Sequence, residues 1–490
     1  MVEGSPLKAE ETKKKRMAQG KAMGIEALLR WGTEIGICDF TPSLIPPSPS
    51  FSCLGYSLFA SHFPDAGGRG LGAARDLKKG ELVLRVPRTA LLTSDSVVRD
   101  EKIACCIKRY PHLSSTQILA VCLLAEVGKG KSSKWYPYLL QLPQYYSTLA
   151  NFTDYEIKSF QLEDAIWVAE KAVKKAKSDW EEVITLMKEM QLKPQLLTLK
   201  SWLWASATVS SRTLHIPWDN AGCLCPVGDL FNYAAPDDEA IDNFNLRLMD
   251  GGYEEDTASY CFYARKKYEQ GEQVLLGYGT YTNLELLEHY GFLLHNNPNE
   301  KVFIQLDTAI FRVSTWPNDS LYIQQDGIPS FALLCCLRLW ATPVNRRRVI
   351  GHLIHSGNLV SVENEVMIMN WLMKNCDKIL GKIPTTIEID DELLILLDKF
   401  LNNSTCLKLV DSLSSKVEIR EFFQAHGLEH EAVTWSELPV RVQKSLERWK
   451  LAVRWRLIYK KTLLRCINHC KDRICELSSQ RGLLREMDQT

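Results

Sequence analysis

The chain has neither a long apolar run nor an excess of charge of one sign. Its 490 residues contain no stretch of about 18 consecutive apolar residues, so the sequence predicts no transmembrane helix and no membrane partner. Lys+Arg and Asp+Glu both number 59, which argues against direct binding of nucleic acid through bulk electrostatics. Hydrophobic residues make up 46% of the chain, so we expect a folded protein with a sizeable core and two or three domains.

The first 23 residues lack the apolar segment of a secretory signal. The run KKKR at 13–16 is open to two interpretations, a nuclear address or a solvated charged tail, and the tail is favoured. The chain has 15 cysteines, an odd number, and many of them lie in apolar runs. That usage is typical of reduced thiols. We therefore expect a cytoplasmic or nuclear protein, with a plastid location left open.

The cysteine spacing does not indicate a metal site. Cys223 and Cys225 form a C-x-C pair with no second pair nearby. The cysteines between residues 466 and 475 fall in a helical pattern, which favours a thiol-rich helix over a zinc site. We therefore expect no metal.

The pattern of apolar residues changes several times along the chain. Short strand-like segments at 56–61 and 81–87 precede a helical stretch, in which Ile166 to Met190 carry an apolar stripe at helical spacing. A hairpin pattern then appears at 243–265. The chain after about residue 300 is mostly helical.

This order predicts an α+β fold, because two separated β-rich pieces need each other for strand pairing. A flexible charged tail is expected at 1–23. A β-rich domain at 24–300 then comprises an N-terminal part (24–90), a helical insert (91–205) and a C-terminal part (206–300). An all-α domain is expected at 301–490.

The stretch GGRGLGAARDLKKGE contains glycines in a pattern that matches a dinucleotide-binding string. That fingerprint requires a strand before it and a full helix after it. Here a Lys-Lys-Gly turn and a strand follow too soon, so we reject the nucleotide-binding interpretation. Gly68 and Gly70 still allow a close approach of backbone to a ligand, and a plain glycine-rich hairpin loop remains the alternative.

Three later motifs place polar residues beside apolar segments. Arg212 ends an apolar helix in ATVSSRTLHIP, and Asn232-Tyr233 ends an apolar run in GDLFNYAAPDDEA. Tyr278 ends a strand in LLGYG, and Tyr290 with Phe292 follows in HYGFL. Taken singly, each has an ordinary structural explanation, such as a surface arginine or a half-buried tyrosine.

Taken in order, these motifs resemble the SET-domain protein methyltransferases, and within them the Rubisco large-subunit methyltransferase-like branch with its plant-type members. The motifs cover roughly residues 60–300. This branch has a split SET domain with a helical insert, followed by a helical substrate-binding domain. The resemblance implies S-adenosylmethionine (SAM) as cofactor and a protein lysine side chain as substrate. It implies a monomer that acts on a non-histone protein.

The resemblance also assigns roles to residues. Gly68, Arg69, Gly70 and Leu71 match the loop that lies against SAM. Arg212 matches a position near the cofactor carboxylate, and Asn232 matches an asparagine that bonds the methionine moiety. Tyr278 matches the catalytic tyrosine, which also touches the cofactor. Tyr290 and Phe292 match aromatic residues that line the target channel and the adenine pocket.

Two positions qualify this expectation. Tyr233 replaces the histidine that the family usually has at a position whose backbone contacts SAM. An inactive SET-like binding module is therefore a second hypothesis. The branch also contains a histidine methyltransferase that acts on actin. Leu214, two residues after the motif arginine, is assigned to the substrate channel and offers no hydrogen bond to an imidazole. We therefore expect lysine rather than histidine as target.

Overall fold

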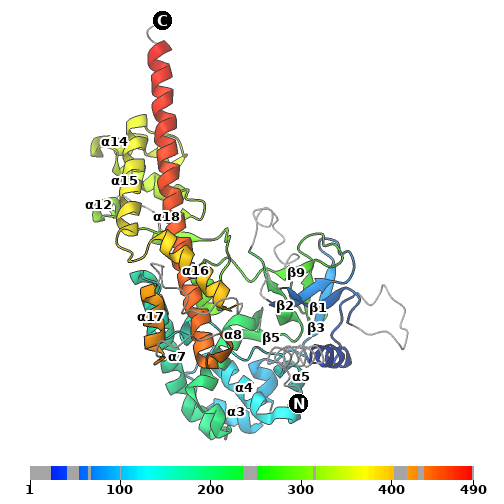
Figure 1. Cartoon of the computed structure of the whole chain (residues 1–490). Helices are drawn as coiled ribbons and strands as arrows, with labels where there is room; N and C mark the ends of the chain where they lie inside the picture. The colour runs from blue at the N-terminus through cyan, green and yellow to red at the C-terminus, as the bar shows by residue number, and fades with distance from the viewer. Residues whose placement is uncertain are drawn as a thin grey trace, which may run out of the picture. The chain divides into compact units, whose positions relative to one another are not determined.

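The computed structural model describes residues 24–40, 54–63, 68–99, 101–235, 251–312, 316–401, 416–428 and 435–487 (Figure 1). The predicted tail at 1–23, the Pro/Ser stretch after residue 40 and the turn after Ala235 lie outside the described residues. Internal contacts divide the chain into two units. The first contains residues 1–151 and 173–280, and the second contains residues 152–172 and 281–490.

The first unit is built on small sheets. Its four-stranded sheet has the order β1-β2-β9-β6, and β3, β8 and β7 form a three-stranded sheet. A separate hairpin pairs β4 with β5. The strands are β1 Leu58–Phe63, β2 Gly68–Ala73, β3 Leu82–Pro87, β4 Thr213–Ile216, β5 Asp219–Leu224, β6 Asn232–Tyr233, β7 Gly252–Glu254, β8 Ser259–Tyr263 and β9 Gln273–Leu276.

The predicted strands at 56–61 and 81–87 correspond to β1 and β3, and the described part of the predicted hairpin contains β7 and β8. The glycine-rich segment is not a loop, however. Gly68 to Ala73 form strand β2, which pairs antiparallel with β1 over its full length. Gly72 shows why small residues are needed there, since a methyl group on it would lie 2.6 Å from the ring of Phe59.

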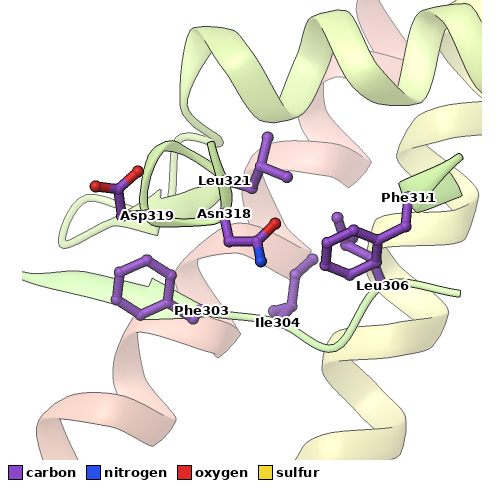
Figure 2. Close-up of a pocket in the computed structure, with 7 residues that line it drawn as sticks. All are labelled: Phe303, Ile304, Leu306, Phe311, Asn318, Asp319 and Leu321. Atoms are coloured by element: carbon purple, nitrogen blue, oxygen red, sulfur yellow. The ribbon is translucent and has the colours of Figure 1, made fainter. Parts of the chain in front are cut away.

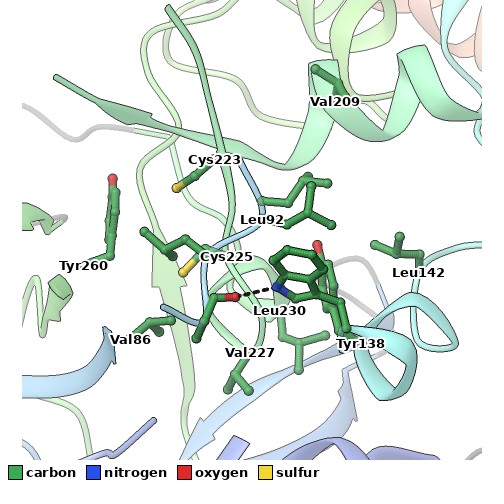
Figure 3. Close-up of a cluster of buried hydrophobic side chains, with 14 of the residues drawn as sticks. Val86, Leu92, Tyr138, Leu142, Val209, Cys223, Cys225, Val227, Leu230 and Tyr260 are labelled. Carbon is green, nitrogen blue, oxygen red and sulfur yellow. Dashed lines mark hydrogen bonds between the residues drawn. The ribbon is translucent and has the colours of Figure 1, made fainter. Parts of the chain in front are cut away.

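Helices surround these sheets. Those of the first unit are α2 Ser94–Val98, α3 Glu101–Ile107, α4 Ser115–Lys129, α5 Tyr136–Leu139 and α8 Leu199–Arg212, with the second half of α7 Glu163–Glu189. Helix α4 starts where Ser114 and Gln117 cap each other's backbone N–H groups. The core that it helps to build is shown in Figure 3, where Val86, Leu92, Tyr138 and Val227 point toward one another.

The second unit is mostly helical. It contains α6 Asp154–Lys158, α11 Asn283–His289, α12 Thr308–Phe311, α13 Phe331–Trp340, α14 Val344–His355, α15 Val362–Leu380, α16 Ile387–Leu401, α17 Lys416–Ala425 and α18 Val440–Met487. A two-stranded sheet pairs β10 Lys301–Phe303 with β11 Tyr322–Gln324. Helix α18 packs against α15 and α16.

Buried ion pairs attach other segments to α18. Arg456, which is fully buried, contacts Asp390 at 2.8 Å and Glu418 at 2.7 Å. Arg448 donates to Glu156 of α6 at 2.7 Å. The Arg448–Glu156 pair explains why residues 152–172, which were predicted to belong to a helical insert of the β-rich domain, group with the second unit.

The α+β fold with a helical C-terminal region is confirmed. Within the described part of the chain, no helix is both long enough and apolar enough to cross a membrane.

We predict a pH-dependent stability that originates at Glu300. Its carboxylate accepts from the Asn283 N–H at 2.9 Å at the start of α11, and burial raises its pKa to about 7. Because the unfolded chain binds fewer protons than the folded chain between about pH 5 and 7, stability should fall as the pH rises through that window. One pKa unit corresponds to about 1.4 kcal/mol, so the full change is on the order of a few kcal/mol.

Thermal unfolding of wild type and Glu300→Gln between pH 5 and 8 tests this. The glutamine accepts the same N–H groups but does not ionise. Wild type should therefore lose stability relative to the variant as the pH rises, and a constant difference between the two proteins would contradict the prediction.

Candidate functional site

A cluster of polar residues forms where β6, β9 and β2 meet. Strand β6 pairs in parallel with β9, with Asn232 opposite Leu275 and Tyr233 opposite Leu276. Strand β9 also pairs antiparallel with β2, with Gly72 opposite Gln273. The predicted residues of the glycine segment and of the Asn-Tyr segment therefore share one sheet, although about 160 residues separate them in sequence.

Gly70 lies against two buried side-chain amides. A methyl group on Gly70 would lie 2.6 Å from Asn232 Nδ2 and 2.6 Å from Gln273 Nε2. Both nitrogens are buried and lack a hydrogen-bond partner among the described residues. Buried donors without partners are rare, because each one costs free energy. This arrangement is suited to a ligand that carries acceptor atoms.

Tyr278 and Tyr233 contact each other near the ends of strands β9 and β6. The Tyr278 hydroxyl donates to the Phe231 carbonyl oxygen, and the Tyr233 hydroxyl donates to the Gly279 carbonyl oxygen at 2.9 Å. The two rings have centroids 5.2 Å apart. Burial raises the pKa of Tyr278 above its usual value, so its hydroxyl keeps the proton at neutral pH.

Arg212 is partly buried at the end of α8. Its Nη1 donates to the Asp229 carbonyl oxygen at 2.9 Å and to Asp229 Oδ2 at 3.2 Å, and its Nε donates to the Tyr146 hydroxyl at 3.3 Å. Tyr138 donates to the same carboxylate at 2.8 Å. Burial disfavours the charged form of Arg212, but Asp229 and the nearby tyrosines hold its pKa above the usual value.

Arg69 belongs to the same electrostatic neighbourhood. It donates to Gln141 Oε1 at 2.8 Å. Burial lowers its pKa, Asp229 opposes that change and the positive charge of Arg212 adds to it. The site thus contains two arginines and one carboxylate, which leaves a net positive charge.

The backbone that carries Asp229 is strained. Val227 adopts a left-handed conformation with φ of 68° directly before the short turn Gly228–Leu230. A β-branched residue is unfavourable in that region, and such strain is concentrated at functional sites.

The remaining predicted residues lie elsewhere. Leu71 is buried in the core of the first unit, and Leu214 is partly buried against that core from strand β4. Tyr290 and Phe292 belong to the second unit, where their rings lie 6.1 Å apart. Tyr290 also lies 5.5 Å from the ring of Tyr281.

Three residues of this cluster were not predicted from the sequence. Gln273 opens the strand QVLL after a glycine turn, and that polar start was the available signal. Asp229 lies three residues before Asn232, in the same motif GDLFNYAAPDDEA. Tyr138 lies in the segment WYPYLLQLP, which carries no recognisable motif, and its pairing with Asp229 spans 91 residues.

Comparison with known proteins agrees with the geometry. The family model for the SET domain matches residues 68–279, and the model for the Rubisco LSMT substrate-binding domain matches residues 301–412. Protein SET DOMAIN GROUP 40 of Arabidopsis thaliana is 47% identical over 488 residues, which cover 94% of this chain and 99% of that protein. The chain belongs to the SET-domain family. The predicted resemblance to its Rubisco LSMT-like branch is confirmed.

Other similarities of this SET-domain protein are more distant. Actin-histidine N-methyltransferase of Xenopus tropicalis is 28% identical over 399 residues, which cover 71% of this chain and 63% of that protein. The solved structure of the SET domain of LSMT bound to lysine and AdoHcy has a TM-score of 0.56 at 18% identity and covers 94% of this chain and 93% of that one. Rubisco LSMT bound to AdoMet has a TM-score of 0.53 at 19% identity, with coverage of 95% and 96%.

We predict that removing one partner of the Arg212–Asp229 pair destabilises the fold. Asp229→Asn keeps the shape but leaves a partly buried guanidinium without its counter-charge, so we expect a loss of about 3 kcal/mol in the free energy of unfolding. Asp179→Asn is the matched control, because Asp179 pairs with the exposed Lys175 and should lose less than about 1 kcal/mol. Urea unfolding measures both, and equal losses would contradict the prediction.

Proposed function

We propose that this protein is a SAM-dependent protein-lysine N-methyltransferase that acts on a non-histone protein substrate. The observation that carries the proposal is the pair of unpartnered buried amides, Asn232 and Gln273, at Gly70. They lie on the sheet that leads to Tyr278, within the residues matched by the SET model. Structures of Rubisco LSMT, which shares the fold, contain AdoMet or AdoHcy.

The residues of the site fit such a cofactor. Asn232 and Gln273 supply hydrogen-bond donors. Arg212 Nη2 donates no hydrogen bond to the described residues, so it is available to donate to a carboxylate of the cofactor. Gly70 leaves room for these two amide groups, because a side chain at that position would lie against both of them. When bound, SAM supplies an activated methyl group on a positively charged sulfur.

Tyr278 orients the reacting groups. Its hydroxyl oxygen and the Phe231 carbonyl oxygen are neighbours, and oxygen atoms of this kind can hold a polarised methyl group through CH···O contacts. Because burial raises the pKa of Tyr278, its hydroxyl stays protonated at neutral pH. We assign it the role of aligning the two reactants.

Tyr233 supports this arrangement despite its departure from the family pattern. Its hydroxyl bonds the Gly279 carbonyl oxygen and its ring contacts Tyr278, so it braces the segment that carries Tyr278. This bracing favours an active enzyme over an inactive binding module.

A protein-histidine methyltransferase is the second candidate, supported by the similarity to actin-histidine N-methyltransferases. The family resemblance assigns Leu214 to the substrate channel, and this favours lysine, because a leucine side chain offers no hydrogen bond to orient an imidazole. Acid hydrolysis of the methylated product distinguishes N-methyllysine from N-methylhistidine.

We predict that SAM binding depends on the space at Gly70. Wild type should bind SAM in a calorimetric titration, and Gly70→Ala should weaken binding at least tenfold, because its methyl group displaces the amides of Asn232 and Gln273. Gly252→Ala is the control, since no atom lies within 4 Å of the added methyl group. A wild-type chain that binds no SAM would refute the proposed function.

We predict that Tyr278→Phe separates catalysis from cofactor binding. Removing one positioned hydroxyl should lower the rate about 100-fold or more, while SAM affinity changes little. The assay measures transfer of radiolabelled methyl from SAM into N-methyllysine of a total protein extract. Tyr263→Phe removes a hydroxyl that bonds Glu254 in β7 and should keep the wild-type rate. A Tyr278→Phe enzyme with the wild-type rate would contradict the assigned role.

A further inference from the structure

A pocket in the second unit lies between the segment that follows β10 and the turn before β11. It has a volume of about 390 Å³, within the range of small binding pockets. Seven residues line it: Phe303, Ile304, Leu306, Phe311, Asn318, Asp319 and Leu321 (Figure 2).

The pocket has an apolar floor and aromatic walls. Ile304 and Leu321 are buried, whereas Phe303 and Phe311 are 43% and 42% exposed. Figure 2 shows the two phenyl rings on opposite sides of Asn318. Large exposed apolar patches mark interaction sites. Two exposed phenyl rings beside a concave apolar surface therefore indicate that this surface binds a partner.

The rim of the pocket carries two exposed polar side chains, Asn318 and Asp319. The side chains of Asn318 and Asp319 form no hydrogen bond or ion pair with described residues. No Lys or Arg is among the lining residues. The pocket therefore has a negative charge at one edge and no cationic side chain in its lining.

We propose that this pocket binds an apolar side chain of the protein substrate, Phe, Leu or Met, with a Lys or Arg next to it in the sequence. The anchor fills the space between Phe303 and Phe311, and the basic group pairs with Asp319 in a charge-assisted hydrogen bond. The contact is separate from the methylated residue and selects which protein is recognised. The inference rests on the proposed function, since it assigns a recognition element to that enzyme's substrate.

A protein side chain fits this pocket better than a small molecule does. Small-ligand sites enclose most of the ligand's surface, whereas the walls here stay more than 40% exposed. Anchors at protein interfaces, in contrast, are single aromatic or aliphatic side chains in shallow pockets. All seven lining residues fall within the 301–412 match to the Rubisco LSMT substrate-binding model.

A random library of displayed 12-residue peptides, selected on the full-length chain, tests the proposal. Selected peptides should share Phe, Leu or Met with Lys or Arg within two positions. The best peptide should lose at least about tenfold in affinity on Phe311→Asp, measured by fluorescence polarisation. Ile395→Asp is the matched control, because Ile395 lies on α16, is 54% exposed and does not line the pocket.

A charge reversal tests the second half of the motif. Selection on Asp319→Lys should retain the apolar anchor and replace the neighbouring Lys or Arg by Asp or Glu. Asp377→Lys, at an exposed position of α15 outside the pocket, should leave the motif unchanged.

Three results would overturn the proposal: no shared motif, a motif that binds Phe311→Asp as tightly as wild type, or a basic preference that survives Asp319→Lys. Self-association of the wild-type chain that Phe311→Asp abolishes would assign the pocket to a second copy instead. A SAM titration of each variant shows whether a negative result concerns the pocket alone or the proposed methyltransferase function as well. If SAM binds normally and no motif appears, the pocket assignment fails and the methyltransferase proposal stands.

Discussion

The parallel pairing of β6 with β9 is the constraint on which the candidate site depends. Only two residue pairs define it, Asn232 with Leu275 and Tyr233 with Leu276. A shift of one residue would exchange the faces on which Asn232 and Tyr233 lie, and the Asn232 amide would then leave Gly70. A parallel pair also requires a long crossover connection, which here contains the β7–β8 hairpin of another sheet.

Within each unit, buried charges restrict how the helices and strands can pack. In the first unit Asp229 satisfies Arg212 and Tyr138 together. In the second unit Asp390 accepts from both Arg456 and Lys460. Buried pairs of this kind add little net stability, because desolvation offsets the attraction. Their effect is to make alternative packings costly, since any of these would leave a charge buried without its partner.

The proposed chemistry and the proposed recognition use different physical means. Around Gly70 and Tyr278, unpartnered donors and neighbouring oxygen atoms are suited to a small polar cofactor that must be aligned closely. At Phe303 and Phe311, exposed rings and one carboxylate are suited to a larger partner held by burial of apolar area. In this account the first site determines what reaction occurs, and the second contributes to the choice of substrate protein.

The sequence alone determined the fold class and the family and supplied most residues proposed for the candidate site, because ordered motifs such as Asn232-Tyr233 and Tyr278-Gly279 are local strings. It also indicated that glycine was needed at Gly70. Only the tertiary structure identified the residue that requires it, Gln273, and the counter-charge of Arg212, Asp229. It alone assigned residues 152–172 to the second unit. These features depend on contacts between residues far apart in the chain, and neither periodicity nor motif spacing encodes which distant partner a buried polar group meets.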